Sequence, residues 1–488
     1  MSNSNYFTTI GLEVHAELKT ATKMFCNSKN DTEEKRPNVN VCPICMGHPG
    51  TLPVINREAV KHILKIGTAV GGVIADFTEF DRKNYFYPDI PKGYQISQYK
   101  FPLVKGGKLR GVSLTRIHLE EDTAKSTHDV GDAAPTDRLK DGYSLVDFNR
   151  AGVPLMELVT EPVVRSAEEA VRFARELQLL LRYLGIADAN MEKGEMRVEA
   201  NISVSPKEGV FGTKVEVKNL NSFRAVERAI AYEVLRHTTL LEEGNAVIQE
   251  TRGWDESKQT TFSQRRKEES HDYRYFPDPD LPKLSLGLIP EWSSEALARE
   301  IPELPWQRRE RLAKLYALKA PDIEMYVENR ELGDYFEEAA RALDLQELAQ
   351  LASNYITSDI VGLLAKSETP ISRSNLDRIP VGEVASVIRM ITAGVLSSRG
   401  AKDVLAAIFA DGGSAETQAK EKNLIQQSNE GELEATAREI MKEHPKVVDE
   451  YRGGKEASLQ YLIGQGMKRT KGSANPEVLK KIFKKLLK

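Results

Sequence analysis

Alternating polar and apolar residues mark several short stretches in the first half of the chain, and many of the polar positions are carboxylates. In residues 11–18, Glu13, His15 and Glu17 alternate with apolar residues. Because successive side chains of a β-strand point to opposite faces, these three share one face while the apolar residues face a core. This period of two is typical of a half-buried strand and predicts a sheet with one polar face.

Further stretches continue the pattern, so acidic groups from distant parts of the chain are expected on one sheet. Glu157 is the most unusual, because apolar residues flank it on both sides and burial of an unpartnered charge is costly. An ordinary half-solvated sheet accounts for any single stretch, and only the whole set suggests a shared site. The carboxylates concerned are Glu120 within 117–122, Glu157 within 154–159, Glu199 within 197–204 and Glu216 within 214–218.

Carboxylates gathered on one face need compensation, because two like charges about 4 Å apart repel by about 4 kcal/mol at an effective dielectric constant of about 20. A divalent cation is the simplest compensation, and carboxylates with one imidazole suit Mg²⁺ or Mn²⁺ better than zinc. Magnesium on such a platform favours nucleoside triphosphate chemistry. The sequence contains neither a G-x-x-x-x-G-K-[ST] loop nor a G-x-G-x-x-G turn after a strand. Any ATP site would therefore be formed by side chains of the sheet and a bound metal ion rather than by a phosphate-binding loop.

The pattern changes near residue 290, beyond which helical spacing prevails. In the first half, Ser166 and Glu169 form a capping-box pattern, Asn56 is a candidate helix cap, and residues 223–241 repeat apolar residues at helical spacing. Helices of this kind cover sheets, so the first half is predicted to be α+β. At about 150 residues per domain, the 488 residues suggest about three domains.

Composition restricts the classes of protein that remain. Lys and Arg number 68 against 72 Asp and Glu, which argues against binding nucleic acid by bulk charge but permits local basic patches. No apolar run approaches the roughly 20 residues that span a bilayer, so no membrane role is expected. Three cysteines, an odd number, argue against a disulfide scaffold and favour a reducing compartment. We therefore expect a cytoplasmic protein.

Six sequence blocks in the first 290 residues are distinctive as a set. In this order they resemble the B-subunit family of the bacterial tRNA-dependent amidotransferases, and residues 474–476 (ANP) resemble the end of that family's YqeY-like tail. The six blocks are 10–15 (IGLEVH), 81–89 (DRKNYFYPD), 118–122 (HLEED), 147–157 (DFNRAGVPLME), 218–223 (KNLNSF) and 272–277 (DYRYFP).

The resemblance implies one component of a glutamine-hydrolysing carbon–nitrogen ligase. In this family the B subunit uses ATP and Mg²⁺ to phosphorylate the side-chain carboxylate of glutamyl-tRNA(Gln) or aspartyl-tRNA(Asn), and ammonia then converts the acyl phosphate to the amide. A partner A subunit releases the ammonia from glutamine, and a small C subunit completes a heterotrimer. The implied fold is an α+β catalytic cradle in residues 1–292, an all-α helical domain in 293–412 and a YqeY-like, tRNA-binding helical tail in 413–488.

The resemblance also implies roles for individual residues of the acidic face. The family often has Asp at the position of Glu199, whose longer side chain can also bind a metal. Lys83 lies among aromatic residues and is a candidate catalytic or phosphate-binding residue, although a surface lysine packed on Tyr85 is the alternative. The positions implied for Mg²⁺ and catalysis are Glu13, His15, Glu120 and Glu157, with Glu199 and Glu216 around a further metal.

Arg252 and Arg274 are candidate cofactor-binding residues, and both lie near aromatic residues in the sequence. With Trp254, Tyr273 and Tyr275, they could stack the unpaired acceptor end of a tRNA and neutralise its phosphates. The edge of a packed core, with solvated charges, explains the same pattern equally well.

The three cysteines form a separate motif. Cys42 and Cys45 make a C-x-x-C pair, with Cys26 upstream. Some members of the family bind zinc here through four cysteines, and this chain has Ser28 at the fourth position. His48 could replace the missing ligand, because three cysteines and one histidine form an accepted structural zinc site. Reduced thiols kept without a metal are the alternative.

The C-terminal segment is basic, with eight Lys and Arg from Lys468 onward against the single acid Glu477. A basic amphipathic helix also suits a membrane surface or a protein partner, but in an RNA-handling family we expect contact with the tRNA body.

Three functions therefore compete. The chain could be the kinase-like subunit of a tRNA-dependent amidotransferase, a tRNA-binding scaffold for a glutaminase, or a stand-alone metal-dependent ligase for a small acid. The acidic face favours the first, because a scaffold for polyanionic RNA has no use for it.

Overall fold

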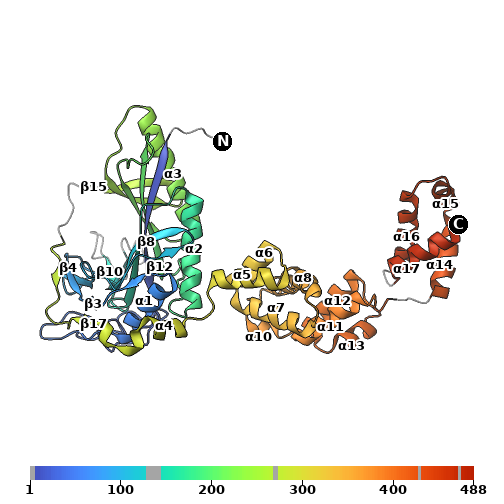
Figure 1. The fold of residues 1–488 in the computed structure, drawn as a ribbon, viewed down its shortest axis with the longest axis horizontal. Helices are drawn as coiled ribbons and strands as arrows, with labels where there is room; N and C mark the ends of the chain where they lie inside the picture. Colours follow the sequence, from blue (N-terminus) through green and yellow to red (C-terminus); the bar gives the residue numbers. More distant parts are fainter. Residues whose placement is uncertain (1–5, 128–143, 267–272, 427–429, 471–473, 488) are drawn as a thin grey trace, which may run out of the picture. The chain divides into compact units, whose positions relative to one another are not determined.

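The computed structural model describes residues 6–127, 144–266, 273–426, 430–470 and 474–487. The chain forms two compact units, Met1–Pro305 and Trp306–Lys488. The first is built around a large sheet, and the second is helical in the part that is described (Figure 1). This confirms the predicted α+β first half and the helical C-terminal region. Domain limits at residues 292 and 412 stay a prediction.

A ten-stranded sheet forms the centre of the first unit. Its middle strands run in the order β12–β1–β11–β8, all antiparallel. These strands are β1 (Phe7–Glu17), β8 (Val112–Glu121), β11 (Pro154–Thr160) and β12 (Met196–Ser205). Each coincides with a stretch whose alternating residues predicted a strand.

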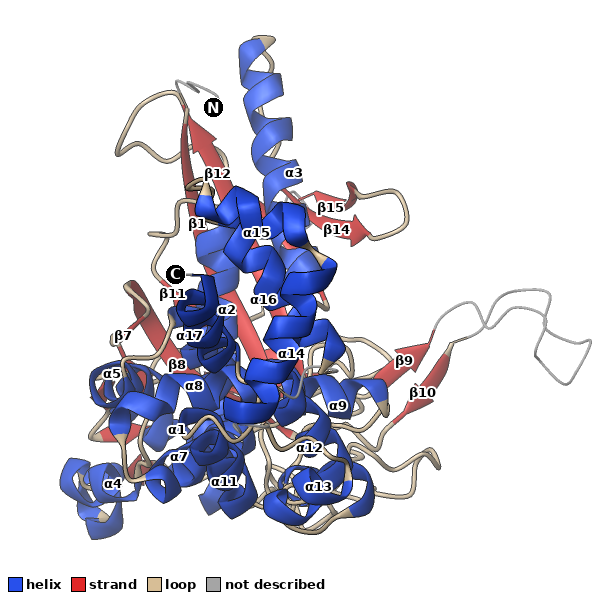
Figure 2. Cartoon of the chain, turned by 90° about the vertical axis from the view of Figure 1, so that its right-hand side faces the viewer, coloured by secondary structure: helices blue, strands red, loops and turns tan. Residues whose placement is uncertain are grey.

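Shorter strands extend the sheet on both sides. The parallel pair β13–β14 and the β14–β15 hairpin continue it beyond β12 (Figure 2). On the other side, β6, β2 and β7 continue it beyond β8. The bounds of the added strands are β2 (Val73–Ile74), β6 (Val104–Lys105), β7 (Lys108–Leu109), β13 (Val215–Leu220), β14 (Glu250–Asp255) and β15 (Thr260–Arg266).

Three helices of the first unit pack on this sheet. Helix α2 (Ala167–Tyr183) and helix α3 (Phe223–Glu242) contact each other and pack on its strands, and α1 (Arg57–Ala69) packs near β8 (Figure 1). Their predicted starts are confirmed: the Ser166 hydroxyl accepts from Glu169 N, and the Asn56 side chain accepts from the amides of Glu58 and Ala59. Glu169 completes the cap by accepting from Arg165 N at 2.8 Å.

Small separate sheets bring further segments of the chain next to the polar face of the large sheet. Strands β16, β4 and β5 pair in that order, and β5 lies against β8. The chain segments around residues 81–97 and 273–277 therefore meet beside the large sheet. The strands of these small sheets are β3 (Phe77–Thr78) with β17 (Leu284–Ser285), β9 (Lys125–Thr127) with β10 (Leu145–Asp147), and β4 (Asp81–Asn84), β5 (Tyr94–Ser97) and β16 (Phe276–Pro277).

Two short 3₁₀ turns, η2 (Leu286–Leu288) and η3 (Pro290–Trp292), and helix α4 (Ser294–Glu300) complete the first unit. The helical spacing predicted beyond residue 290 is confirmed in the described part of the second unit, and one π-helical turn, η5 (Tyr355–Ile360), joins α8 to α9. The remaining elements up to residue 421 are α5 (Pro305–Tyr316), α6 (Ala320–Glu328), α7 (Arg330–Leu343), η4 (Gln346–Leu348), α8 (Ala349–Asn354), α9 (Val361–Lys366), α10 (Arg373–Leu376), α11 (Val381–Thr392), α12 (Ser398–Asp411) and α13 (Ala415–Glu421).

The last four helices enclose a hydrophobic core of their own. Helix α17 buries Leu479 and Phe483 in it, while Lys481, Lys484 and Lys485 of the same helix are exposed. Of the terminal basic residues, Lys471 and Lys488 lie outside the described residues. The four helices are α14 (Glu430–Glu443), α15 (Pro445–Arg452), α16 (Ala457–Arg469) and α17 (Pro476–Leu487).

None of the helices in the described part of the chain is long and apolar enough to cross a membrane.

A buried glutamate ties α3 to the β14–β15 hairpin. The Glu233 carboxylate lies 2.7 Å from Arg236 Nη2 and 3.2 Å from Arg252 Nε, and it accepts a hydrogen bond from the Thr261 hydroxyl. Burial alone would raise the pKa of Glu233, but the contacts with His237, Arg236 and Thr261 lower it to about 2. The contact holds one edge of the large sheet against its covering helix.

We predict that Glu233→Gln destabilises the protein, because it leaves two half-buried arginines, Arg236 and Arg252, short of a counter-charge, at a cost of about 3 kcal/mol. A folded-state pKa below the ordinary value means that the carboxylate stabilises the fold at neutral pH, and that this contribution is lost as pH falls from about 4.5 toward 2. Urea unfolding at pH 7 and pH 3 measures the effect, which should shrink at pH 3. The exposed Glu227→Gln on the same helix is the matched control; equal stability of Glu233→Gln and wild type at pH 7 would contradict the prediction.

Candidate active site

Cross-strand register brings polar side chains from four segments into one row on the large sheet. His15 of β1 stands opposite Glu157 of β11 and opposite Arg197 of β12, and Glu157 in turn stands opposite His118 of β8. Residues directly opposite each other in an antiparallel pair share a face, with Cβ atoms about 4.5–5.5 Å apart. Glu13 lies in the adjacent row, opposite Glu199.

Two groups of potential ligands meet at Glu157. His15 Nε2 lies 3.3 Å from Glu157 Oε2 and 3.8 Å from Glu13 Oε1. His118 Nε2 lies 3.7 Å from the same Glu157 oxygen and 3.5 Å from Glu120 Oε1. Each set of three offers ligand atoms that lie within 4.8 Å of one another. The structure therefore brings together Glu13, His15, Glu120 and Glu157, as the alternating pattern predicted.

The small sheet beside β8 holds Glu120 in place. Ser97 Oγ of β5 donates to Glu120 Oε1 at 2.6 Å, and Gln95 Nε2 donates to Glu120 Oε2 at 3.0 Å. Lys83 of β4 places its ammonium 4.0 Å from Glu120 Oε1. The predicted candidate Lys83 thus lies beside the carboxylates, its ammonium next to Glu120.

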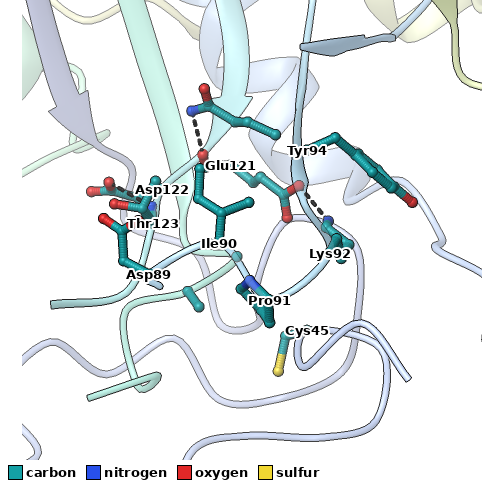
Figure 3. A pocket seen from close by; sticks show the side chains of 12 residues that line it. Cys45, Asp89, Ile90, Pro91, Lys92, Tyr94, Glu121, Asp122 and Thr123 are labelled. Atoms are coloured by element: carbon teal, nitrogen blue, oxygen red, sulfur yellow. Dashed lines mark hydrogen bonds and ion pairs between the residues drawn. The ribbon is translucent and has the colours of Figure 1, made fainter. Parts of the chain in front are cut away.

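Glu121, the next residue of β8, points to the opposite face of that strand and also contacts the segment that contains β5. Its carboxylate pairs with Lys92 and accepts from Ile96 N at 2.9 Å. Figure 3 shows the Lys92 and Glu121 side chains pointing toward each other, with Cys45 in the same hollow. This contact ties residues 92–96 to β8 and so sets Gln95 and Ser97 against Glu120.

The acidic groups are balanced by neighbouring cations. Burial and the charge of Glu157 raise the pKa of Glu13 to about 7. Burial would lower the pKa of His15, but its hydrogen bond to Glu157 raises it to about 9. Burial would raise the pKa of Glu157, but His118 and His15 lower it to about 2. Burial opposes ionisation of Glu120 as well, yet Lys83 and His118 hold its pKa well below the usual value. The site therefore requires positive charge between its carboxylates.

The donor set fits a magnesium ion. Ligand atoms of an octahedral Mg²⁺ at about 2.1 Å lie about 3.0 Å apart when adjacent and about 4.2 Å apart when opposite. The separations between histidine nitrogens and carboxylate oxygens, 3.3 to 3.8 Å, are somewhat longer than the adjacent spacing, so small side-chain rotations would bring these atoms to one cation. Carboxylate oxygens and imidazole nitrogens are also ligands that Mg²⁺ and Mn²⁺ accept.

Glu199 and Glu216 lie on the same sheet but outside those two groups of ligand atoms. Lys218 joins them, with its ammonium 2.8 Å from Glu199 Oε2 and 3.6 Å from Glu216 Oε1. Glu216 also accepts a hydrogen bond from the Thr251 hydroxyl at 2.8 Å. A further metal at these two carboxylates stays a prediction.

A hollow of about 350 Å³ continues along the sheet beyond Glu13. It opens where Gly11 contributes no side chain, and Phe211, 68% exposed, borders it. Its other lining residues are Thr9, Leu12, Val159, Thr160, Pro162, Asn201, Ser203, Gly212 and Lys214.

The structure does not bring the two predicted cofactor-binding arginines to the carboxylates. Arg252 stands opposite Val217 in the β13–β14 pair, on the side of the sheet that faces α3, where it contacts Glu233 and Glu250. Arg274 is exposed just before β16, and its carbonyl accepts from Asn84 Nδ2 at 2.9 Å. Contact of either arginine with ATP stays a prediction.

The three cysteine sulfurs converge within 4.8 Å of one another. Hydrogen bonding from Cys26 lowers the pKa of Cys45 to about 5, and the buried Lys23 ammonium lies 3.8 Å from Cys45 Sγ. Three thiols supply three of the four ligands that structural zinc takes. His48 is not part of this group of converging ligand atoms.

Sequence reasoning missed several residues that complete the site. His118 shares the polar face with Glu120, so the alternation contains a signal for it, although the family resemblance implies no role for this residue. Arg116 lies two residues before His118 and so shares its face of the strand, which is the same signal. Its Nη2 lies 3.1 Å from Glu157 Oε1. The sequence contains no such signal for Gln95 or Ser97, because only the packing of a separate small sheet brings them to Glu120.

Comparisons with known proteins agree with this geometry. Residues 8–289 match the GatB/GatE catalytic domain family, and residues 334–487 match the GatB domain family. Among curated proteins, the chain is similar to the B subunit of aspartyl/glutamyl-tRNA(Asn/Gln) amidotransferase from Carboxydothermus hydrogenoformans, with 43% identity over 98% of each chain. It is also similar to the protein of the same name from Moorella thermoacetica, with 44% identity over 99% of this chain and 100% of the relative. The chain therefore belongs to the family of aspartyl/glutamyl-tRNA(Asn/Gln) amidotransferase B subunits.

Proposed function

We propose that this chain is the ATP-using component of a tRNA-dependent amidotransferase, a glutamine-hydrolysing carbon–nitrogen ligase. It would phosphorylate the side-chain carboxylate of glutamyl-tRNA(Gln), aspartyl-tRNA(Asn) or both. The observation that carries the proposal is the convergence of Glu13, His15, Glu120 and Glu157, from three separate strands, in one buried acidic site. Family membership and the names of the relatives support it.

The chemistry explains why such a site is needed. A carboxylate is a poor acyl donor because oxide is a poor leaving group, whereas phosphate is a good one. The carboxylate oxygen attacks the γ-phosphorus of ATP and releases ADP; ammonia then attacks the acyl carbon and releases phosphate, leaving the amide. Bound Mg²⁺, held by the histidines and carboxylates, would neutralise charge on the phosphates.

Individual residues would position the reactants. The Lys83 ammonium, 4.0 Å from Glu120, would balance charge on the transferred phosphoryl group. Ser97 and Gln95 keep Glu120 in a fixed orientation, so it needs no reorganisation during the reaction. We place ATP in the hollow beyond Glu13, because it adjoins the carboxylates along the same strands and Gly11 leaves it open.

The proposal requires partners. The relatives are named as subunits, which supports assembly into a multi-subunit complex with tRNA. As the family resemblance implies, a glutaminase A subunit would supply ammonia and a small C subunit would complete a heterotrimer. Charged tRNA is used in the cytoplasm, and we place the complex there.

Alternative functions are less consistent with the site. A tRNA-binding scaffold gains nothing from buried carboxylates arranged around two histidines. A stand-alone ligase for a small acid would turn over ATP without charged tRNA, so the dependence of ATP cleavage on misacylated tRNA separates it from the amidotransferase.

For the cysteine cluster, zinc in a structural role remains the proposal. The convergence of Cys26, Cys42 and Cys45 and the low pKa of Cys45 support it, because zinc binds thiolates. Because His48 does not belong to the converging group, the fourth ligand would have to come from another residue or from solvent.

We predict that magnesium stabilises the protein through Glu157. A cation present at 100 times its Kd adds about 2.7 kcal/mol of stability. Thermal unfolding with EDTA or with millimolar MgCl₂ should therefore give a higher Tm with magnesium in the wild type. Glu157→Gln should lose this increase, because Glu157 belongs to both ligand groups, whereas Glu227→Gln should keep it. A full increase in Glu157→Gln would speak against the metal site.

A second prediction concerns catalysis. Glu120→Gln should lower the cleavage of ATP in the presence of misacylated tRNA by about 100-fold or more, because it removes a buried charge beside the transferred group. Binding of tRNA, measured by filter retention, should change less than about twofold. Assays use the chain with its A and C partners, glutamine and each misacylated tRNA in turn. Wild-type ATP cleavage by Glu120→Gln would eliminate the proposed function.

A third prediction concerns the C-terminal helices, which we propose contact the tRNA body. Lys481 and Lys484 are exposed on the face of α17 opposite its buried residues. The double variant Lys481→Gln with Lys484→Gln should weaken tRNA binding and reduce the slope of log K against log salt by up to about 2, since each phosphate contact contributes about 0.7–0.9. The exposed Lys366→Gln is the control. An unchanged slope, together with unchanged affinity after deletion of residues 413–488, would refute the proposal.

A further inference from the structure

Four tyrosines contact one another beside Lys83, and we call them the tyrosine cluster: Tyr85, Tyr99, Tyr273 and Tyr275. They come from three places in the sequence, directly after β4, shortly after β5 and directly before β16. Pairing of these three short strands brings them together. The rings of Tyr99 and Tyr275 stack at 4.4 Å with an interplanar angle of 11°. Tyr273 contacts both Tyr85 and Tyr275 edge to face, at 5.9 and 6.0 Å.

The cluster leaves an aromatic face open to solvent. Tyr99 is 62% exposed although one face of its ring is covered by Tyr275, so the other face points outward. Tyr273 is 36% exposed. Burial raises the pKa of the Tyr275 phenol, so this ring stays neutral beside Lys83. A neutral, preformed pair of stacked rings with one free face is the arrangement on which an unpaired nucleobase stacks.

The cluster also lies next to the reacting groups. The Lys83 ammonium is 5.0 Å from the centre of the Tyr273 ring and 4.0 Å from Glu120 Oε1. A substrate carboxylate that reaches Glu120 is joined, through the aminoacyl ester, to the ribose of the last nucleotide. The base on that ribose must therefore lie one aminoacyl chain and one sugar away from the carboxylates, and the tyrosines lie beyond Lys83 in that neighbourhood.

We propose that the tyrosine cluster stacks the terminal unpaired base of the charged tRNA. The inference rests on the proposed function and names the part of the enzyme that would hold the acceptor end.

The reaction involves a second adenine, that of ATP, and the placement of the two sites separates them. The hollow assigned to ATP lies over β1, β12 and the end of β11, beyond Glu13. The tyrosine cluster adjoins β5, which packs on β8, on the far side of Glu120. The two histidines and Glu157 stand between them. Each adenine thus has its own site, with the phosphate and the carboxylate meeting in the middle.

The test compares intact tRNA with tRNA lacking its terminal nucleotide, bound to the full-length chain and its variants. Base–aromatic stacking contributes enough that removal of the ring weakens binding by about 5- to 100-fold. Wild type should bind intact tRNA more tightly than trimmed tRNA by a factor in this range. Tyr99→Ala should bind the two equally, and Tyr99→Phe, which keeps the ring, should restore the difference. Tyr461→Ala, at a tyrosine of α16 that is 45% exposed, should keep the wild-type ratio between the two affinities, because any contact with the tRNA body is common to intact and trimmed tRNA.

A direct signal comes from tRNA whose terminal adenosine is replaced by 2-aminopurine, whose fluorescence falls on stacking. The wild-type chain should quench it and Tyr99→Ala should not. Affinity for ATP with magnesium, measured by calorimetry on the same proteins, should be unchanged by Tyr99→Ala, which also shows that the variant is folded.

Two results would overturn the assignment. The first is the same preference for intact tRNA in Tyr99→Ala as in wild type. The second is a loss of ATP affinity in Tyr99→Ala with tRNA discrimination retained, which would assign the cluster to the nucleotide. Either result, with ATP cleavage still abolished in Glu120→Gln, rejects the tyrosine assignment and leaves the proposed function standing.

Discussion

The antiparallel register of β8, β11, β1 and β12 is the constraint on which the whole site depends. It sets His15, Glu157 and His118 in one row, although 103 positions separate His15 from His118 in the sequence. Because side chains alternate between faces, a slip of one residue in any of these strands would turn its charged groups into the helix-covered core. The apolar residues of the same strands, buried under α2 and α3, therefore also position the acidic site.

The acidic face was predictable from the sequence because it depends on a local property, the period of two within each strand. Glu13, His15, Glu120 and Glu157 follow from that period, and the helix starts at Asn56 and Ser166 follow from their capping side chains. Contacts with partners far away in the sequence could not be predicted in this way. The local sequence around Arg252 is compatible with a binding residue, but in the structure its guanidinium contacts Glu233. This contact forms only because α3 packs on the β14–β15 hairpin, which the local sequence does not reveal.

The electrostatics of the site suit a protein that must bind and release highly charged reactants. His15, Lys83 and Arg116 offset the carboxylates, so the acidic groups can stay buried in the free protein. A divalent cation can replace the proton on His15 without a change in backbone position, because the potential ligand atoms already lie close to one another. Binding the metal would then cost little conformational entropy.

The consecutive residues Glu120 and Glu121 point to opposite faces of β8, and both bind the segment that contains β5. Glu120 accepts hydrogen bonds from Ser97 and Gln95, and Glu121 contacts Lys92 and Ile96. These contacts on both faces fix the length of backbone between residues 92 and 97. Natural variation in length should therefore be tolerated in the surface loops on either side, whereas an insertion or deletion of even one residue between positions 92 and 97 should be excluded throughout the evolution of this family.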